Sequence, residues 1–146
     1  MELVYRLEHK ETGRGVSHGG AMSVLNDWQN NKAYDHPGPH CQREATENGD
    51  YPLYEAVRSS DDFRFGFLNA TQGRSWFGRA ALCKLAGAGI VLRVYLREDI
   101  KELVEGNFQC VFKRPERAFT FLPTALWTPV LELKTSIRRT IEGRAQ

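Results

Sequence analysis

One short segment combines residue types that could bind an anionic ligand. Residues 69–75, Asn-Ala-Thr-Gln-Gly-Arg-Ser, bring amide and hydroxyl side chains together with an arginine at the predicted start of a helix. A helix N-terminus can bind phosphate because its first N–H groups are unpaired and its dipole is positive there. Capping by Asn69 or Thr71 explains the same residues without a ligand. The segment therefore predicts a capped helix start, with an anion site as the alternative.

A second segment has the chemistry of a zinc site. Residues 36–41, His-Pro-Gly-Pro-His-Cys, hold two imidazoles and a thiol, which are the ligands that zinc prefers. The two prolines exclude a regular helix, so the histidines are not presented one turn apart. A fourth ligand would have to come from His9, His18 or a distant acidic residue. We favour a turn with surface histidines and predict no metal site.

Composition and charge exclude several classes of protein. Twenty basic residues against eighteen acidic ones leave a net charge of +2, which does not indicate nucleic-acid or membrane binding. No apolar stretch approaches the roughly 18 residues of a membrane span, and the N-terminus lacks the pattern of a signal peptide. Cys41, Cys83 and Cys110 are odd in number and far apart, so no disulfide framework is expected. We therefore expect a cytoplasmic protein.

The elements that must position these residues follow from the apolar patterns. Strands are predicted over 2–8, 63–68, 90–96 and 108–112. Helices are predicted over 21–28, from the cap at Asn69 or Thr71 to residue 85, and from residue 134 onwards, with a helical turn over 98–104. A long loop is predicted over 29–51, residues 53–57 fit either a helical turn or a strand, and 118–133 fit either a strand pair or a partner surface.

The order of these elements indicates the fold class. Separated strands and helices favour an α+β protein with a small split sheet, mixed or antiparallel, over a doubly wound one. The length of 146 residues fits one core. We expect a single α+β domain over residues 1–133 and a helical or frayed C-terminal tail over 134–146.

The same order resembles the ADP-ribosyltransferase-like fold. The resemblance rests on Tyr5-Arg6 in a first strand, on the strand that runs through residues 67–71 into a helix, and on the Val-Tyr strand of residues 91–95. It implies an NAD cleft between sheets. By this resemblance Arg6 would hold phosphate, Asn69 and Thr71 would support the nicotinamide site, and Tyr95 would line the cofactor site.

The fourth strand departs from that family. The transferases carry a catalytic glutamate at the start of a late strand, and Gln109 stands at the matching place in this chain. A neutral glutamine lacks the charge that stabilises a cation-like transition state. Glu105, in the turn before, would have to substitute. The candidate catalytic residues are therefore Glu105 and Gln109, in a cleft that is degenerate or unusual.

A further resemblance concerns the source of the chain. The Tyr-Arg start, the His-Pro-x-Pro segment and the Phe-Gly-Phe strand before a Trp-Phe helix resemble short proteins encoded by tailed phages. We therefore expect a phage factor that binds or inhibits a host protein. Its binding surface would be a C-terminal apolar run, Phe119, Phe121, Leu126, Trp127 and Val130. The alternative is an active NAD-dependent ADP-ribosyltransferase that modifies a host macromolecule.

Overall fold

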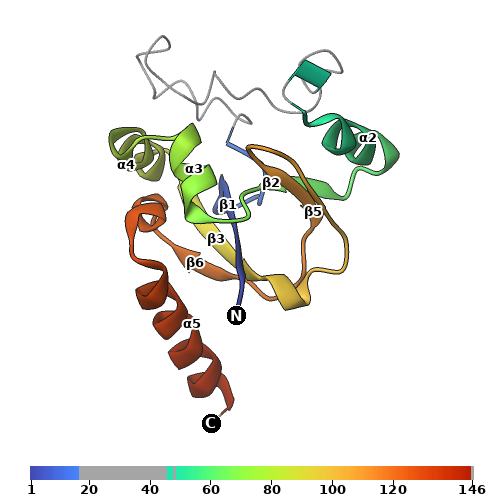
Figure 1. The fold of residues 1–146 in the computed structure, drawn as a ribbon. Coiled ribbons are helices and arrows are strands. Elements are labelled where there is room, and N and C mark those ends of the chain that lie inside the picture. Colours follow the sequence, from blue (N-terminus) through green and yellow to red (C-terminus); the bar gives the residue numbers. More distant parts are fainter. Residues whose placement is uncertain (17–45, 48, 146) are drawn as a thin grey trace.

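The fold is built around two small antiparallel sheets (Figure 1). The computed structural model describes residues 1–16, 46–47 and 49–145. The first sheet has the order β1-β3-β6, from strands Leu3–His9, Ile90–Leu96 and Phe119–Phe121. The second sheet has the order β2-β5-β4, from strands Phe63–Gly66, Cys110–Lys113 and Leu103–Glu105.

Main-chain hydrogen bonds join the two sheets at a single residue pair among the described residues. The N–H of Tyr5 donates to the carbonyl of Phe67 over 2.9 Å, and the N–H of Phe67 donates back over 2.7 Å. Gly66 precedes this junction, and a Cβ atom there would lie 2.6 Å from the carbonyl oxygen of Tyr5. Only glycine therefore lets the second sheet approach the edge of β1 so closely.

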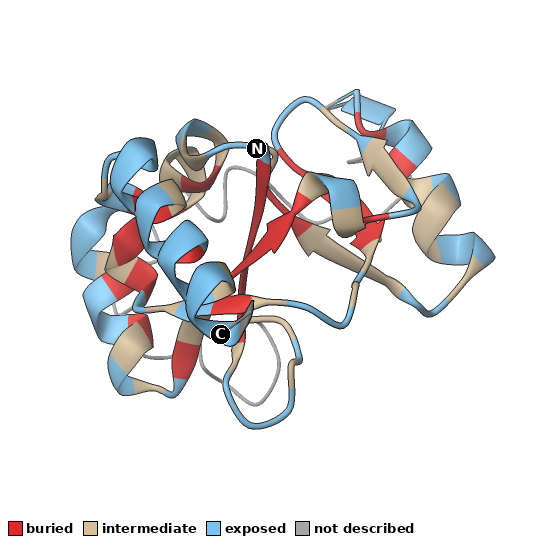
Figure 2. Ribbon diagram, turned by 90° about the horizontal axis from the view of Figure 1, so that it is seen from below, coloured by how far each residue is buried: buried red, intermediate tan, exposed pale blue. Residues whose placement is uncertain are grey.

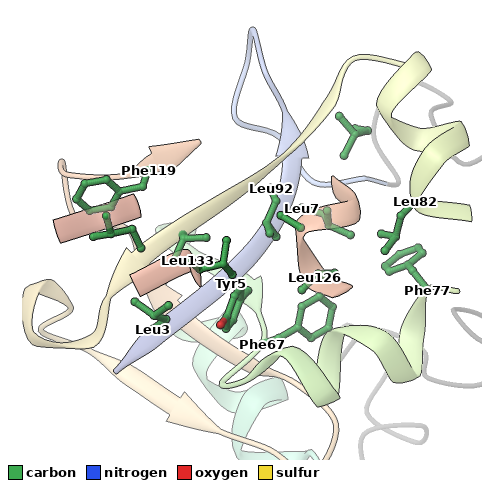
Figure 3. Close-up of a cluster of buried hydrophobic side chains, with 14 of the residues drawn as sticks. Leu3, Tyr5, Leu7, Phe67, Phe77, Leu82, Leu92, Phe119, Leu126 and Leu133 are labelled. Atoms are coloured by element: carbon green, nitrogen blue, oxygen red, sulfur yellow. The ribbon is translucent and has the colours of Figure 1, made fainter. Parts of the chain in front are cut away.

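Strand β1 is buried on both faces because it lies between two layers. Its residues Leu3, Tyr5 and Leu7 pack in one core cluster with side chains from the helices, such as Leu82 and Leu126 (Figure 3). The alternate residue Val4 joins a second cluster with side chains of the second sheet. The first sheet is thus covered by helices on one face and by the second sheet on the other.

The helices lie on the outside of both sheets. Helices α3 (Ala70–Trp76), α4 (Arg79–Gly87) and α5 (Val130–Ala145), with the 3-10 helix η4 (Pro123–Trp127), lie on the side of the first sheet, whereas α2 (Tyr51–Ser59) packs on the second. A further 3-10 helix, η3 (Arg97–Asp99), follows β3. In Figure 2 the central strands are buried and the outward faces of the helices are exposed.

The predicted fold class, α+β with small antiparallel sheets, is confirmed. The strand predictions over 2–8, 63–68, 90–96 and 108–112 each overlap an observed strand, namely Leu3–His9, Phe63–Gly66, Ile90–Leu96 and Cys110–Lys113. The open segment at 53–57 belongs to helix α2. Helix α5 begins at Val130, and its side chains Leu133 and Ile137 are buried in the first core cluster. The C-terminal helix therefore starts before residue 134, where the tail was expected to begin, and packs against the core of the domain.

Three predicted elements were wrong in detail. The single helix through residue 85 is two helices, because Phe77 adopts an extended conformation that sends its ring into the core and Gly78 starts the next helix. The helical turn at 98–104 is only the 3-10 turn η3, and residues 103–105 instead pair with β5. The strand that 127–133 could have formed is the end of η4 and the start of α5.

Several predictions lie outside the described residues. These are the helix at 21–28, most of the loop at 29–51, and the His-Pro-Gly-Pro-His-Cys segment at 36–41. Within the described ranges no group of three or more His, Cys, Asp or Glu side chains could hold a metal ion. In the same ranges, no helix is long and apolar enough to cross a membrane.

Candidate functional site

A cavity of about 340 Å³ lies where the two sheets diverge. On one side of the Tyr5–Phe67 pair the edge of β1 is no longer joined to the second sheet. Leu3 lines the cavity there, and its N–H and C=O point to the same edge as those of Tyr5, since alternate residues of a strand share an edge. Among the described residues, β1 pairs with β3, with Phe67 through Tyr5 and with Gly15 through Glu8, and neither of these two bridges involves Leu3. Beside the cavity, this edge of β1 therefore has no strand partner at Leu3 in the described residues.

The charged side chains around the cavity balance one another. Glu2 and Glu105 supply two carboxylates, and Arg97 and Lys134 supply two cations. Apolar side chains complete the wall, among them Leu3 and Val130. A volume of about 340 Å³ is at the lower end of small-molecule sites, which span roughly 300–1,000 Å³. The cavity suits a small group or an inserted side chain better than a strongly anionic ligand.

Two of the predicted site residues meet at this cavity. Asn69 lines it and caps helix α3, accepting a hydrogen bond from the N–H of Gln72 over 2.9 Å. Glu105 lines it from the end of β4. Tyr5 also lines the cavity, and burial raises the pKa of its hydroxyl while the nearby Arg74 opposes that shift.

The structure places the other predicted site residues elsewhere. Thr71 is exposed, and its hydroxyl accepts a hydrogen bond from Arg74 over 3.3 Å. Tyr95 is buried against Phe112, with ring centroids 5.3 Å apart. Neither is among the residues that line the cavity. Of the six predicted site residues, Asn69 and Glu105 line this cavity, and Arg6, Thr71, Tyr95 and Gln109 do not.

Gln109 is buried in a polar contact that fixes a turn. Its side chain donates to Asp50 over 3.4 Å, and the N–H of Asn107 donates to the same carboxylate over 2.9 Å. A Cβ atom on Gly106 would lie 2.4 Å from Asp50 Oδ1, so glycine is needed between β4 and β5. Asp50 thus joins the start of α2 to the β4–β5 turn, and sequence reasoning did not detect its role.

Arg6 belongs to a buried ion network between the two sheets. Its Nε donates to Glu8 over 2.8 Å and its Nη1 to the carbonyl of Phe65 over 2.8 Å. Arg93 and Arg114 also donate to Glu8, over 3.0 and 3.1 Å. Burial lowers the pKa of Arg6, and the charge of Glu8 opposes that shift. The i, i+2 spacing of Arg6 and Glu8 on a strand was the sequence signal for this network.

Large apolar side chains are exposed at the junction of η4 and α5. Leu122 and Leu131 are 70% and 71% exposed, and Trp127 and Val130 are each 44% exposed. We call these four residues the apolar surface. Of the predicted surface run, Trp127 and Val130 are exposed, whereas Phe119 and Leu126 are buried in the core and Phe121 is half-buried. Phe119 is buried because it lies in β6, which pairs with β3, and Leu126 is buried because η4 turns it inwards against β3 and α4.

Comparison with known proteins identifies a family. The model of a family described as "Bacteriophage T4 Y00F protein" matches residues 1–120. No curated protein and no solved structure matches the chain. The expected phage affiliation is confirmed by the family match, while the resemblance to ADP-ribosyltransferases stays a prediction.

Proposed function

Because this chain belongs to the bacteriophage T4 Y00F protein family, we propose that it is a phage factor that binds and inhibits a host protein. The observation that carries this proposal is the apolar surface. Soluble proteins seldom leave several large apolar side chains exposed together unless a partner covers them. Leu122 and Leu131 keep about seven-tenths of their surface exposed.

The composition of the surface fits a protein partner. The guanidinium of Arg74 lies 5.5 Å from the ring centroid of Trp127, and its Nη1 donates to the carbonyl of Leu126 over 2.9 Å. Tryptophan and arginine dominate binding energy at protein interfaces because they supply large rigid contact areas and several hydrogen bonds. Val130 belongs both to the apolar surface and to the wall of the cavity. A partner bound at this surface can therefore place one side chain in the cavity.

The placement of Arg6 and Gln109 supports a binding protein over a transferase. Arg6 is 3% exposed and engaged with Glu8, and Gln109 is 2% exposed and engaged with Asp50. Releasing a buried charge from its partner costs several kcal/mol, so Arg6 is a poor phosphate ligand. A protein that binds a partner without catalysis does not need Arg6 or Gln109 to contact a ligand.

Affinity capture with matched surface variants tests the binding proposal. Immobilised wild type, Leu131→Asp and Tyr51→Asp are each incubated with extract of a host bacterium. Tyr51 is 39% exposed on α2, away from α5 in Figure 1, so it controls for a charge added to an exposed apolar site. We expect one host protein to be retained by wild type and Tyr51→Asp and lost from Leu131→Asp. Identical capture by all three proteins would contradict the proposal.

A second candidate function is ADP-ribosyl transfer from NAD. It is favoured by one observation, the shared cavity of Asn69 and Glu105. A ligand that binds only the folded protein raises its melting temperature by mass action. If this function holds, millimolar NAD should raise the melting temperature of the wild type. The rise should be smaller for Glu105→Gln. If NAD does not change the melting temperature of the wild type, the transferase function is refuted, whereas the binding proposal is unaffected.

A further inference from the structure

The ion network around Glu8 carries more positive charge than its carboxylate can neutralise. Three guanidinium groups, from Arg6, Arg93 and Arg114, donate to this one carboxylate. In the described part of the chain their contacts include no second carboxylate. Three positive charges and one negative charge leave a formal surplus of +2. Charges removed from water are costly unless they are paired.

The strand register makes this surplus harder to explain by packing alone. Arg6 and Arg93 are directly opposite each other across the antiparallel β1–β3 pair. Like charges at opposed positions destabilise a sheet. Glu8 relieves their repulsion, but Arg114 then brings a third cation from beyond the end of β5. If the only role of the network were to neutralise the two opposed arginines of the sheet, Arg114 would not be needed.

The surplus charge is reachable from solvent at two of the three arginines. The side chain of Arg6 is 4% exposed, whereas those of Arg93 and Arg114 are 22% and 35% exposed. Solvent therefore reaches the network at Arg93 and Arg114 but not at Arg6. We call Arg93 and Arg114 the open arginines.

The open arginines have hydrogen-bond donors left over. A guanidinium has five N–H donors in a planar fork. Arg93 donates to Glu8, to the hydroxyl of Thr120 and to the carbonyl of Lys10. Arg114 donates to Glu8, to the carbonyl of Gly13 and to the hydroxyl of Tyr95. Each of the two arginines thus has about two N–H groups for a further acceptor.

We propose that Arg93 and Arg114 bind the dianionic phosphate group of a phosphate monoester at the open side of the Glu8 network. Two negative charges match the surplus of two, and paired arginine forks suit phosphate oxygens. The turn before Gly15 supports the site, since Gly13 has φ +72° and a Cβ atom there would lie 2.5 Å from Arg114 Nη1. This site lies apart from the cavity, since neither arginine lines it, and does not depend on the partner proposed above.

Nuclear magnetic resonance of the wild-type protein tests the site directly. Inorganic phosphate is titrated at pH 8 into ¹⁵N-labelled protein, with sodium chloride of equal ionic strength as the control. We expect the Nε–H signals of Arg93 and Arg114 to shift and saturate with phosphate only. Arg117 is the internal control, because its guanidinium already makes two bonds with Asp99, over 2.9 and 3.1 Å. Equal, unsaturated shifts of all three signals would overturn the proposal as ionic screening.

Two variants provide a second measurement. Arg114→Gln removes an open donor, and Arg117→Gln removes the surface control. Phosphate should raise the melting temperature of wild type and Arg117→Gln alike, whereas Arg114→Gln should bind phosphate at least about tenfold more weakly, since a charged hydrogen bond is lost. A phosphate-dependent rise that persists in folded Arg114→Gln contradicts the assignment. A nucleoside monophosphate that binds more tightly than phosphate identifies a nucleotide as the source, and equal affinity identifies the free anion.

Discussion

Replacement of Glu8 by glutamine removes the one carboxylate that Arg6, Arg93 and Arg114 share in the described part of the chain. Glutamine keeps the length of the side chain and one carbonyl acceptor, so the change isolates the charge. In the wild type both carboxylate oxygens are used, Oε2 by Arg6 and Arg114 and Oε1 by Arg93. In Glu8→Gln the three guanidinium groups face a neutral amide whose NH₂ group cannot accept from any of them.

The cost follows from burial. Glu8 and Arg6 are 2% and 3% exposed, so neither charge is screened by water. Removal of one partner from a buried ion pair costs about 3–5 kcal/mol. Domains of this size have a free energy of unfolding of about 5–15 kcal/mol. We therefore expect Glu8→Gln to lose a large part of the stability of the fold.

Urea unfolding followed by circular dichroism measures this cost. The change should appear as a lower midpoint with an unchanged slope, because the folded and unfolded surfaces stay alike. Glu102→Gln is the matched control, since Glu102 pairs with Lys113 over 2.6 Å but is 56% exposed. Its loss should cost at most about 1 kcal/mol. If Glu8→Gln costs no more than Glu102→Gln, the charge of Glu8 does not hold the network together and our reasoning is refuted.

Three further predictions concern other buried positions. Gln109→Glu should lower the free energy of unfolding by about 3 kcal/mol or more in the same urea assay, because it puts a second carboxylate beside buried Asp50. A variant as stable as the wild type would show that residue 109 does not contact Asp50. Gly66→Ala should lower the free energy of unfolding by about 1–3 kcal/mol in urea, since its Cβ would lie 2.6 Å from Tyr5 O and from a Phe112 ring carbon. An unchanged urea midpoint would show that the two sheets can move apart at this junction. Burial raises the pKa of the Cys110 thiol to about 12, so iodoacetamide at pH 8 should alkylate exposed Cys83 but reach Cys110 only after denaturation, as read by peptide mass spectrometry; alkylation of both in the folded protein would contradict it.

Alternation and caps account for what the sequence predicted of the fold. The apolar runs at β1 and β3 are long enough to identify strands, and Asn69 caps α3 as its side-chain chemistry requires. The break at Phe77 could not be predicted in the same way. The helical spacing of apolar residues continues through Phe77 and Gly78, and only the packing of the Phe77 ring in the core stops the helix. Tertiary contacts overrode the local pattern there.

The candidate site was less predictable because it depends on how the two sheets lie. Asn69 and Glu105 are 36 positions apart in the sequence, and they share a cavity only because the sheets diverge beyond the Tyr5–Phe67 pair. The spacing of Arg6 and Glu8 places both on one face of a strand. That the second sheet buries this face is a property of the packing, which no local pattern expresses.

The buried polar residues limit which side chains are available to a ligand. In the described residues four charged or polar side chains are buried: Arg6, Glu8, Asp50 and Gln109. Each contacts a segment far along the chain, as Arg6 contacts Phe65 and Asp50 contacts Asn107. Buried polar groups must be paired to be tolerated, so these residues are committed to holding the sheets and turns together. We therefore expect any ligand or partner to be bound by groups outside this buried set, namely Arg93 and Arg114 and the apolar surface.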